Sequence, residues 1–374
     1  MNGLAEAVVD LGAIRANVAA LADQVGSAGV MAVVKADGYG HGMIPTATAA
    51  VAGGASWLGV VGVQEGLALR AAGLTARVLC LMDDPDAAHA EAISRDIDLS
   101  VSSVGQLDLL SAAARQAGKP ASLHLKVDTG MSRGGAPATS WPELVDVALA
   151  AQAAGYIQVT GIWSHLACAD MPGHSSVPAQ LTAFDDALEL AEKAGARPQL
   201  RHIANTAATL TLPQSWLDLV RPGGGIYGLS TQPGGAPRWL RPAMTARTRL
   251  VLVKRVPAGS GVSYGHRYIT AAETTLGLVP QGYAEGVPRN ASNEVQVQVR
   301  GRRRTIAGTV CMDQFVVDLG DDPVAVGDAV VLFGPGDDGE PTAQEWADRL
   351  GTLSYDIAIG FGGRAARTYL PVTS

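Results

Sequence analysis

The stretch Ala-Val-Val-Lys-Ala-Asp-Gly-Tyr-Gly-His-Gly, residues 32–42, joins an apolar run to a glycine-rich turn through a single lysine. Residues 30–34 carry no charge and are rich in valine, so they predict a buried strand. Lys35 is then expected where this strand passes into a loop, and its ammonium group must be solvated, paired or made neutral. A side chain that reaches into water is one interpretation. The glycine-tyrosine-glycine turn behind it favours another, a covalent bond to an aldehyde cofactor.

Up to about residue 229 the chain alternates between apolar runs and alanine-rich amphipathic segments. Helices are expected over 104–117, 141–154 and 178–194, each followed by a glycine. Strands are expected over 29–35, 57–61, 77–81, 97–101, 122–128, 157–164, 199–204 and 218–221. Eight strands with helical crossovers predict a parallel (β/α)8 barrel of the TIM type. A doubly wound open sheet is the alternative, although no G-x-G-x-x-G motif opens an early helix.

After Gly228 the composition changes. Pro233, Gly234 and Gly235 open a linker-like stretch, and beyond it the runs 295–299 and 315–317 alternate with period two. We therefore expect a barrel domain over residues 1–235 and a mainly β-strand domain over 236–374. The extreme N-terminal strand is a candidate for pairing with the second domain.

Composition excludes several classes of protein. The chain has 374 residues, 47% of them hydrophobic, which argues against disorder, and its net charge of -7 argues against a nucleic-acid partner. The basic run 300–304 reads as a solvated hairpin turn. The N-terminus, Met1-Asn2-Gly3, does not resemble a signal peptide, and the longest uncharged run is interrupted by polar residues, so no membrane span is expected. Without metal-ligand spacing, the three cysteines predict a reducing cytoplasm and no metal site: Cys80, Cys168 and Cys311.

Polar residues gather where the predicted strands end, which is where the chemistry of a (β/α)8 barrel lies. Three adjacent glycines, 223–225, follow the last strand, and their backbone amides can approach an anion closely. A lysine at the first strand and a phosphate cradle near the last two describe pyridoxal 5'-phosphate. The strand-end residues are Lys35, Lys126, Asp128, Arg133, Trp163, Ser164, His165, His202, Asn205, Thr206 and Arg221.

Over essentially its full length the chain resembles the alanine racemases, a fold-type III family of pyridoxal phosphate enzymes. The first motif, A-V-V-K-A-D-G-Y-G-H-G, is highly specific, and the order and spacing of the others add to it. They are K-V-D-T-G-M-S-R at 126–133, H-I-A-N-T at 202–206, R-P-G-G-G-I-Y-G at 221–228, G-V-S-Y-G at 261–265, G-Y-A-E-G at 282–286 and V-C-M-D-Q at 310–314.

The resemblance implies a reaction with two bases. Lys35 would hold the cofactor covalently and act as the base on one face of the substrate. Tyr264, donated by a partner subunit, would act on the opposite face, because one group cannot readily serve both faces of a planar carbanion. A phenol is a weak base at neutral pH, so it needs a hydrogen-bonding partner, for which the resemblance offers His165 and then Arg221.

The resemblance also assigns the remaining site residues. Arg221 would donate to the pyridine nitrogen and leave it unprotonated, which suppresses transamination, and His202 would orient Arg221. Arg133 and the main chain of Met312 would bind the substrate carboxylate. Lys126 corresponds to a lysine that is carbamylated in many relatives. The cofactor-binding set would be Lys35, Tyr39, His165, Asn205, Thr206, Arg221, Gly223, Gly224 and Tyr355.

The implied function is that of a cytoplasmic, homodimeric isomerase that interconverts L- and D-alanine and supplies D-alanine for peptidoglycan. A racemase of other or broader amino-acid specificity is the alternative, although Tyr283, Tyr355 and Met312 would narrow the way in and favour a small side chain. A barrel decarboxylase or lyase would need an acidic group where Arg221 stands. A non-enzymatic pyridoxal phosphate carrier would leave the chain from about residue 240 onward unexplained.

Overall fold

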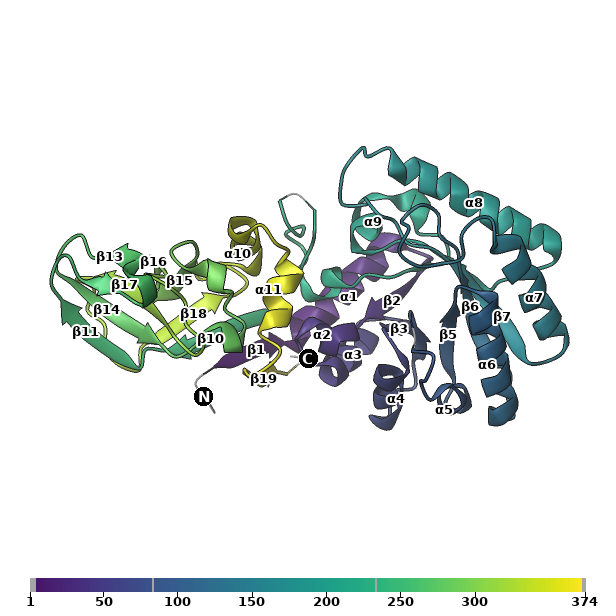
Figure 1. The fold of residues 1–374 in the computed structure, drawn as a ribbon, viewed down its shortest axis with the longest axis horizontal. Coiled ribbons are helices and arrows are strands. Elements are labelled where there is room, and N and C mark those ends of the chain that lie inside the picture. Colours follow the sequence, from purple (N-terminus) through teal and green to yellow (C-terminus); the bar gives the residue numbers. More distant parts are fainter. Residues whose placement is uncertain (1–4, 83, 233, 372–374) are drawn as a thin grey trace.

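The computed structural model describes residues 5–371 except 83 and 233, so Met1-Asn2-Gly3 and Pro233 lie outside the described residues. Its larger part is an eight-stranded parallel sheet in the order β8-β7-β6-β5-β4-β3-β2-β9 (Figure 1). The strands are β2 (Gly29–Val33), β3 (Trp57–Val60), β4 (Arg77–Cys80), β5 (Ile97–Val101), β6 (Ala121–Lys126), β7 (Ile157–Trp163), β8 (Leu200–His202) and β9 (Leu219–Val220).

Two backbone hydrogen bonds bring the ends of this sheet together. The amide of Asp218 donates to Arg201 O at 3.2 Å, and the amide of Arg221 donates to Ala204 O at 2.9 Å. The sheet is therefore a nearly closed barrel. Every one of its strands overlaps the range expected from the sequence, and the predicted (β/α)8 fold is confirmed.

Helices surround the barrel, and α6 (Val104–Ala117) shows why these segments are helical. The Ser103 side chain accepts from the amide of Gln106, and Gly118 ends the helix in the left-handed conformation that glycine adopts most easily. Its buried side chains recur at helical spacing, as an amphipathic helix requires. The others are α1 (Leu11–Val25), α3 (Met43–Ala52), α4 (Val63–Ala71), α5 (His89–Ser94), α7 (Trp141–Ala153), α8 (Ser176–Ala194) and α9 (Thr206–Thr211).

The second part of the chain is mainly β, with sheets ordered β16-β15-β18-β10-β1-β19, β11-β14-β17 and β12-β13. Buried and partly exposed residues alternate along strands such as β17, as in a sheet with one face on a core. Its elements are β10 (Met244–Arg249), β11 (Leu252–Val256), β12 (Gly261–Val262), β13 (Tyr268–Ile269), β14 (Thr274–Val279), β15 (Gln296–Val299), β16 (Arg302–Thr305), β17 (Phe315–Gly320), β18 (Ala329–Phe333), α10 (Ala343–Leu350), α11 (Ser354–Gly360) and β19 (Ala366–Leu370).

The basic run 300–304 forms a hairpin, as expected. Val299 pairs with Arg302 across a two-residue turn in which Arg300 and Gly301 both have positive φ. That conformation matches the right-handed twist of paired strands, so it favours a tight hairpin. The remaining arginines lie on β16.

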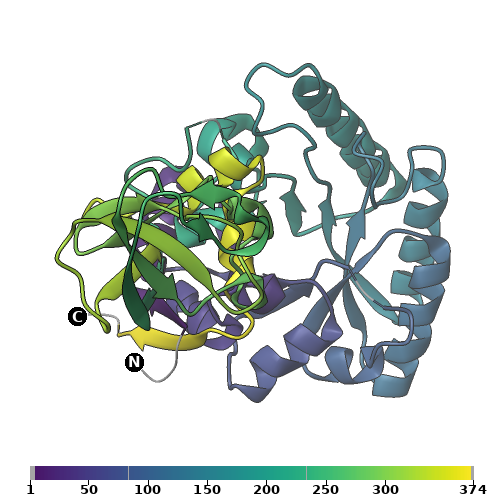
Figure 2. The same cartoon turned by 60° about the vertical axis from the view of Figure 1, so that its left-hand side comes forward.

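The two ends of the chain meet in one sheet. Strand β1 (Glu6–Asp10) pairs antiparallel with β10 and parallel with β19. The chain then enters the barrel through α1. Helix α11 lies between the β-strand part and the barrel, and Figure 2 shows the β-strand part at one side of the barrel. Within the described ranges, no helix combines the length and apolar character needed to cross a membrane.

Candidate active site

Lys35 begins a left-handed turn and does not end a strand. Strand β2 stops at Val33, two residues earlier than expected, and α2 (Lys35–Tyr39) follows it. Residues 36–39 have φ angles of 52°, 51°, 65° and 52°. For residues other than glycine this conformation costs roughly 1–2 kcal/mol each, so contacts from elsewhere must stabilise the turn.

Two carboxylates make those contacts. Glu65, on α4, accepts from the amide of Ala36 at 2.9 Å. Asp37 accepts from the amide of Met43 at 2.8 Å and pairs with Arg367 of β19 at 2.6 Å. The turn that carries Lys35 is therefore fastened to the barrel and to the last strand of the chain.

The environment of Lys35 favours the neutral amine. Burial lowers the pKa of Lys35, the positive charge of Arg133 lowers it further, and Glu65 opposes the shift. A neutral amine is the nucleophilic form, which a covalent bond to an aldehyde requires.

Aromatic rings pack around Tyr39, at the end of the turn that carries Lys35. Tyr39 packs against Tyr227 with ring centroids 5.0 Å apart and meets Tyr355 of α11 edge to face at 5.5 Å. The His41 ring stacks on the Tyr227 ring, with centroids 4.5 Å apart. Burial raises the pKa of Tyr355 to about 12, so its hydroxyl stays protonated and can donate a hydrogen bond.

The loop after β9 forms a cradle with no room for side chains. A Cβ on Gly223 would overlap the hydroxyl of Tyr39, and a Cβ on Gly224 would overlap the ring of Tyr355. Thr206 Oγ1 accepts from the amides of Gly223 at 2.9 Å and Gly225 at 3.3 Å, and it also hydrogen bonds to Tyr355. Backbone amides and hydroxyl groups that converge in this way fit a phosphate group.

Asn205 lies beside this cradle. Its Oδ1 accepts from the amide of Ala208 at 3.0 Å and caps helix α9. That hydrogen bond leaves the side-chain NH2 group of Asn205 available as a donor near Thr206.

Arg221 is buried, and its partners are all neutral acceptors. One terminal nitrogen donates to Nδ1 of His202 at 2.8 Å, and the other to Ser164 O at 2.7 Å. The second nitrogen also reaches Nδ1 of His165 at 3.2 Å and Ile203 O at 3.3 Å. Burial lowers the pKa of Arg221 to about 9.

Cations crowd the neighbouring strand ends. Burial lowers the pKa of Lys126 to about 8, and Arg133 and Arg221 add to the shift. Burial, and then the charges of the same two arginines, hold the pKa of His165 well below its usual range, so its ring is neutral. Because Nδ1 of His165 accepts from Arg221, its Nε2 carries the proton and is a donor. The negative charge of Asp128 opposes these cations at Lys126, and burial and the cations together outweigh it.

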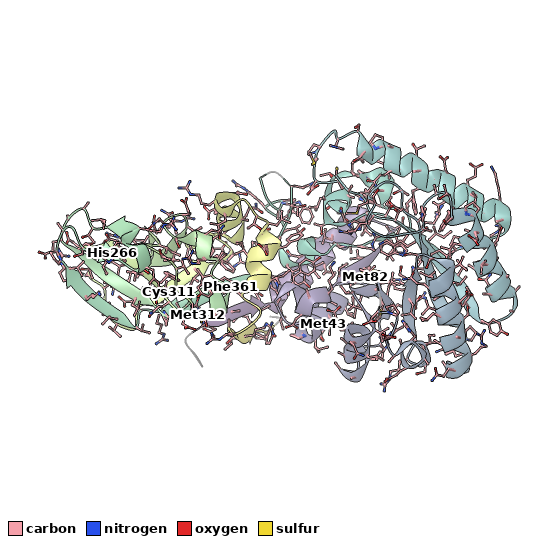
Figure 3. The ribbon with its side chains drawn as sticks, in the orientation of Figure 1. Met43, Met82, His266, Cys311, Met312 and Phe361 are labelled. Carbon is pink, nitrogen blue, oxygen red and sulfur yellow. The ribbon has the colours of Figure 1, made fainter. Side chains whose placement is uncertain are left out.

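Tyr264 and Met312 lie outside this group. Tyr264 begins the 3-10 turn Tyr264–His266 between β12 and β13, and its side chain is 73% exposed. Figure 3 labels His266, from the same turn, at the end of the β-strand part remote from the barrel. With Met312 and Tyr283, Tyr264 lines a pocket of about 390 Å³. The structure therefore brings the expected barrel residues together, while the two residues from the second part open to the surface.

Sequence patterns missed the residues that hold the site in shape. Glu65, Asp37 and Arg367 fix the left-handed turn, and no spacing or motif marked them for that role. Tyr227 stood within R-P-G-G-G-I-Y-G at 221–228, and its hydroxyl donates to Val33 O at 3.2 Å. An aromatic residue two positions after three glycines was the one available signal.

Comparison with known proteins gives a consistent result. Family models described as the N-terminal and C-terminal domains of alanine racemase match residues 9–231 and 243–369. A curated alanine racemase of Thermobifida fusca is 56% identical over 369 residues, which cover 99% of each chain. One from Frankia casuarinae is 56% identical and covers 97% of this chain and 96% of that one.

Solved structures agree with these sequence matches. The crystal structure of alanine racemase from D-cycloserine-producing Streptomyces lavendulae has a TM-score of 0.98 and 52% identity, covering 99% of this chain and 98% of that one. The alanine racemase of Streptomyces coelicolor A3(2) has a TM-score of 0.96 and 53% identity, covering 98% of each chain.

Proposed function

This chain belongs to the alanine racemase family, and from that premise we propose that it interconverts L-alanine and D-alanine with pyridoxal 5'-phosphate as its cofactor. The enzyme is an amino-acid racemase, an isomerase. The observation that carries the proposal is the joint placement of Lys35, Arg221 and the glycine cradle at one end of the barrel.

The residues of the site fit this cofactor. Thr206, Gly223, Gly224, Tyr39 and Tyr355 would hold its phosphate, with Asn205 contributing an amide donor. Lys35 would bind its aldehyde carbon, and Arg221 would donate to its pyridine nitrogen. Once bound, the cofactor supplies an electron sink for the pair of electrons left when the α-proton is removed.

The protein's own groups would move that proton. Burial lowers the pKa of Lys35 and so raises the share of neutral amine, which would accept a proton on one face of the substrate. Tyr264 of the partner subunit would serve the opposite face, and the Nε2–H of His165 is free to donate to its oxygen. We therefore propose a homodimer with shared active sites, which explains why an aromatic side chain is 73% exposed in the single chain.

Arg133 and the main chain of Met312 would bind the substrate carboxylate. The positive charge of Arg133 lowers the pKa of both Lys35 and Lys126, which supports a role for Arg133 beside them in the site. Met312, Tyr283 and Tyr355 would narrow the entrance to the active site and exclude substrates with large side chains. A broader amino-acid specificity is the alternative outcome of the assay below.

We propose that Lys126 is carbamylated. Its pKa of about 8 provides the neutral amine that reacts with carbon dioxide, and the product carries a negative charge among Arg133, Arg221 and Lys35. A carbamate would then balance part of this positive charge and position Arg133.

The two parts of the chain would have different roles. Residues 1–235 would bind the cofactor, and residues 236–374 would supply the second base to the partner subunit. The expected location is the cytoplasm, where D-alanine is supplied for peptidoglycan, and the dispersed cysteines fit a reducing compartment.

A chirality-resolved assay tests the proposal. The purified protein is incubated with pyridoxal 5'-phosphate and a panel of L-amino acids, and cofactor absorbance is recorded in parallel. We expect D-alanine to form fastest. Absence of D-alanine in a protein that binds the cofactor would refute the activity, and faster turnover of a larger amino acid would support the broader-specificity alternative.

A further inference from the structure

The barrel interior contains a column of polar side chains where apolar ones would suffice. Interiors of such barrels are dominated by valine, isoleucine and leucine. Here Met31, Trp57, Leu79 and Leu219 form an apolar cluster. Asp98 of β5, His124 of β6 and His202 of β8 are buried as well, with exposed fractions of 4%, 0% and 0%.

These three side chains form a continuous hydrogen-bonded chain that ends at Arg221. Nδ1 of His202 accepts from Arg221, and Nε2 of His202 lies 2.9 Å from Nδ1 of His124. Nε2 of His124 lies 3.2 Å from Oδ2 of Asp98, which also pairs with Arg77 at 2.8 Å. The column thus runs from the candidate active site to the start of β4, at the opposite end of the barrel.

The direction of the protons in this column is determined by its two ends. Arginine has only donors, so Nδ1 of His202 must accept and its Nε2 must carry the hydrogen. That hydrogen points to Nδ1 of His124, whose own hydrogen is then on Nε2 and points to the Asp98 carboxylate, which has only acceptors. Burial lowers the pKa of both His124 and His202, so each ring is neutral and has a single N–H.

The surrounding structure makes room for this arrangement. A Cβ on Gly161 of β7 would overlap the ring of His124, and the pairing of β6 with β7 shifts register between Leu123 and His124. Trp163 stacks on His202 with ring centroids 5.7 Å apart, and the Arg221 guanidinium lies 4.7 Å from the same indole. No cluster of three or more His, Cys, Asp or Glu side chains in the described ranges could hold a metal ion.

Burying a carboxylate and two imidazoles costs free energy, and apolar residues of similar volume would be no worse for stability. The stability of the fold therefore does not account for the column. Arg221 is a buried cation whose direct partners carry no negative charge, and the column links it to the carboxylate of Asp98.

Resting on the proposed function, we propose that Asp98 and His124 are positioning residues for Arg221. Asp98 acts as its remote counter-ion, and His124 links the two by accepting from His202 and donating to Asp98, which holds the His202 ring in place. The column keeps the guanidinium charged and oriented toward the pyridine-binding position. Neither Asp98 nor His124 touches the substrate or the cofactor.

Nitrogen-15 NMR of the histidine-labelled holoenzyme tests the direction of the column without any assay of turnover. We expect His124 and His202 to be neutral, each with its hydrogen on Nε2. A hydrogen on Nδ1 of either ring, or an imidazolium, would overturn the proposal. A racemase assay that failed would leave this measurement intact, so failure of the proposed function can be told apart from failure of the column.

Kinetics of three variants test its effect. Asp98→Asn keeps the shape and an acceptor oxygen but removes the charge, and Gly161→Ala displaces His124 without altering the charge. We expect Asp98→Asn and Gly161→Ala each to lower kcat about tenfold in both directions of the reaction, with little change in KM for alanine. A loss of about tenfold is what one lost charge-assisted hydrogen bond implies. Arg77→Gln removes a half-exposed partner of the same carboxylate and should stay within about twofold of the wild type.

The pattern among the variants separates positioning from stability. If Asp98→Asn and Gly161→Ala matched Arg77→Gln in kcat and changed only the thermal midpoint, the column would be structural and the proposal wrong. Should Asp98→Asn fail to fold, Gly161→Ala and the NMR of the wild-type protein still decide.

Discussion

Arg367 and Asp37 form an ion pair at 2.6 Å between the last strand of the chain and the turn that carries Lys35. The Arg367 guanidinium also donates to Gly40 O at 2.9 Å and Gly362 O at 2.6 Å. The left-handed turn is therefore stabilised by a residue more than three hundred positions away.

Arg367→Ala is expected to destabilise the protein by about 2 kcal/mol, from two lost backbone hydrogen bonds and a partly exposed ion pair. It should also reduce retention of pyridoxal 5'-phosphate, because the turn at Lys35 loosens. Denaturant unfolding and cofactor absorbance after dialysis measure the two effects. Arg349→Ala, in the last turn of α10 and paired with Glu294, is the control and should leave cofactor retention unchanged; equal losses in both variants would contradict the role of Arg367.

Lys35→Ala should abolish covalent attachment of the cofactor and nearly all racemisation, because it removes the tether and one base. Borohydride reduction followed by peptide mapping checks the attachment site. The exposed Lys193→Ala variant serves as the control and should keep a labelled Lys35 peptide. A labelled lysine elsewhere in Lys35→Ala would move the anchor to that residue.

Tyr264→Phe tests the second base. The substitution removes one hydroxyl and leaves the ring, so lost activity reports proton transfer and not packing. Loss of a general base costs about 10²–10⁴-fold. Exchange of the α-proton with deuterated solvent should become one-sided, surviving for D-alanine through Lys35 and failing for L-alanine.

Mixing inactive Lys35→Ala and Tyr264→Phe subunits tests the shared site of the proposed dimer. Each heterodimer should regain one intact pair of bases, and activity should rise with the fraction of heterodimer. Heterodimers that form, as native mass spectrometry can establish, but stay inactive would rule out Tyr264 of the partner subunit as the second base.

Gly224→Ala should weaken cofactor binding at least tenfold, because the new Cβ overlaps the ring of Tyr355 and forces it out of the cradle. Titration of the cofactor-free protein with pyridoxal 5'-phosphate measures the change. Gly105→Ala is the matched control, since its Cβ would meet nothing within 4 Å and should stabilise α6 by up to about 1 kcal/mol. Unchanged affinity in Gly224→Ala would place the phosphate elsewhere.

Carbamylation of Lys126 should increase as pH rises through about 8, the pKa of its amine. Below that pH the amine is protonated and cannot attack carbon dioxide; above it a nitrogen–carbon bond forms and one proton is released. Carbon-13 NMR with labelled bicarbonate detects the product, and Lys126→Arg should lack the signal. A wild-type spectrum without a carbamate resonance at pH 9 would refute the modification.

The sequence by itself determined the barrel and which polar residues lie at or just after its strand ends. Short apolar runs bounded by glycine specify strands, and amphipathic segments such as 104–117 specify helices, because both patterns are local. The same local patterns place Lys35 directly after the first apolar run of the barrel. They also place the three glycines 223–225 after its last predicted strand.

Only the tertiary structure decided how these residues are held. The left-handed turn at 36–39 depends on Arg367, the cradle depends on Tyr355 of α11, and the orientation of Arg221 depends on side chains from three separate strands. None of these contacts produces a periodic pattern in the sequence, because each joins residues far apart in the chain. Their free energy arises only once distant segments pack together: the contacts of Arg367 and Tyr355 need the C-terminal part against the barrel, and those of Arg221 need the barrel strands side by side.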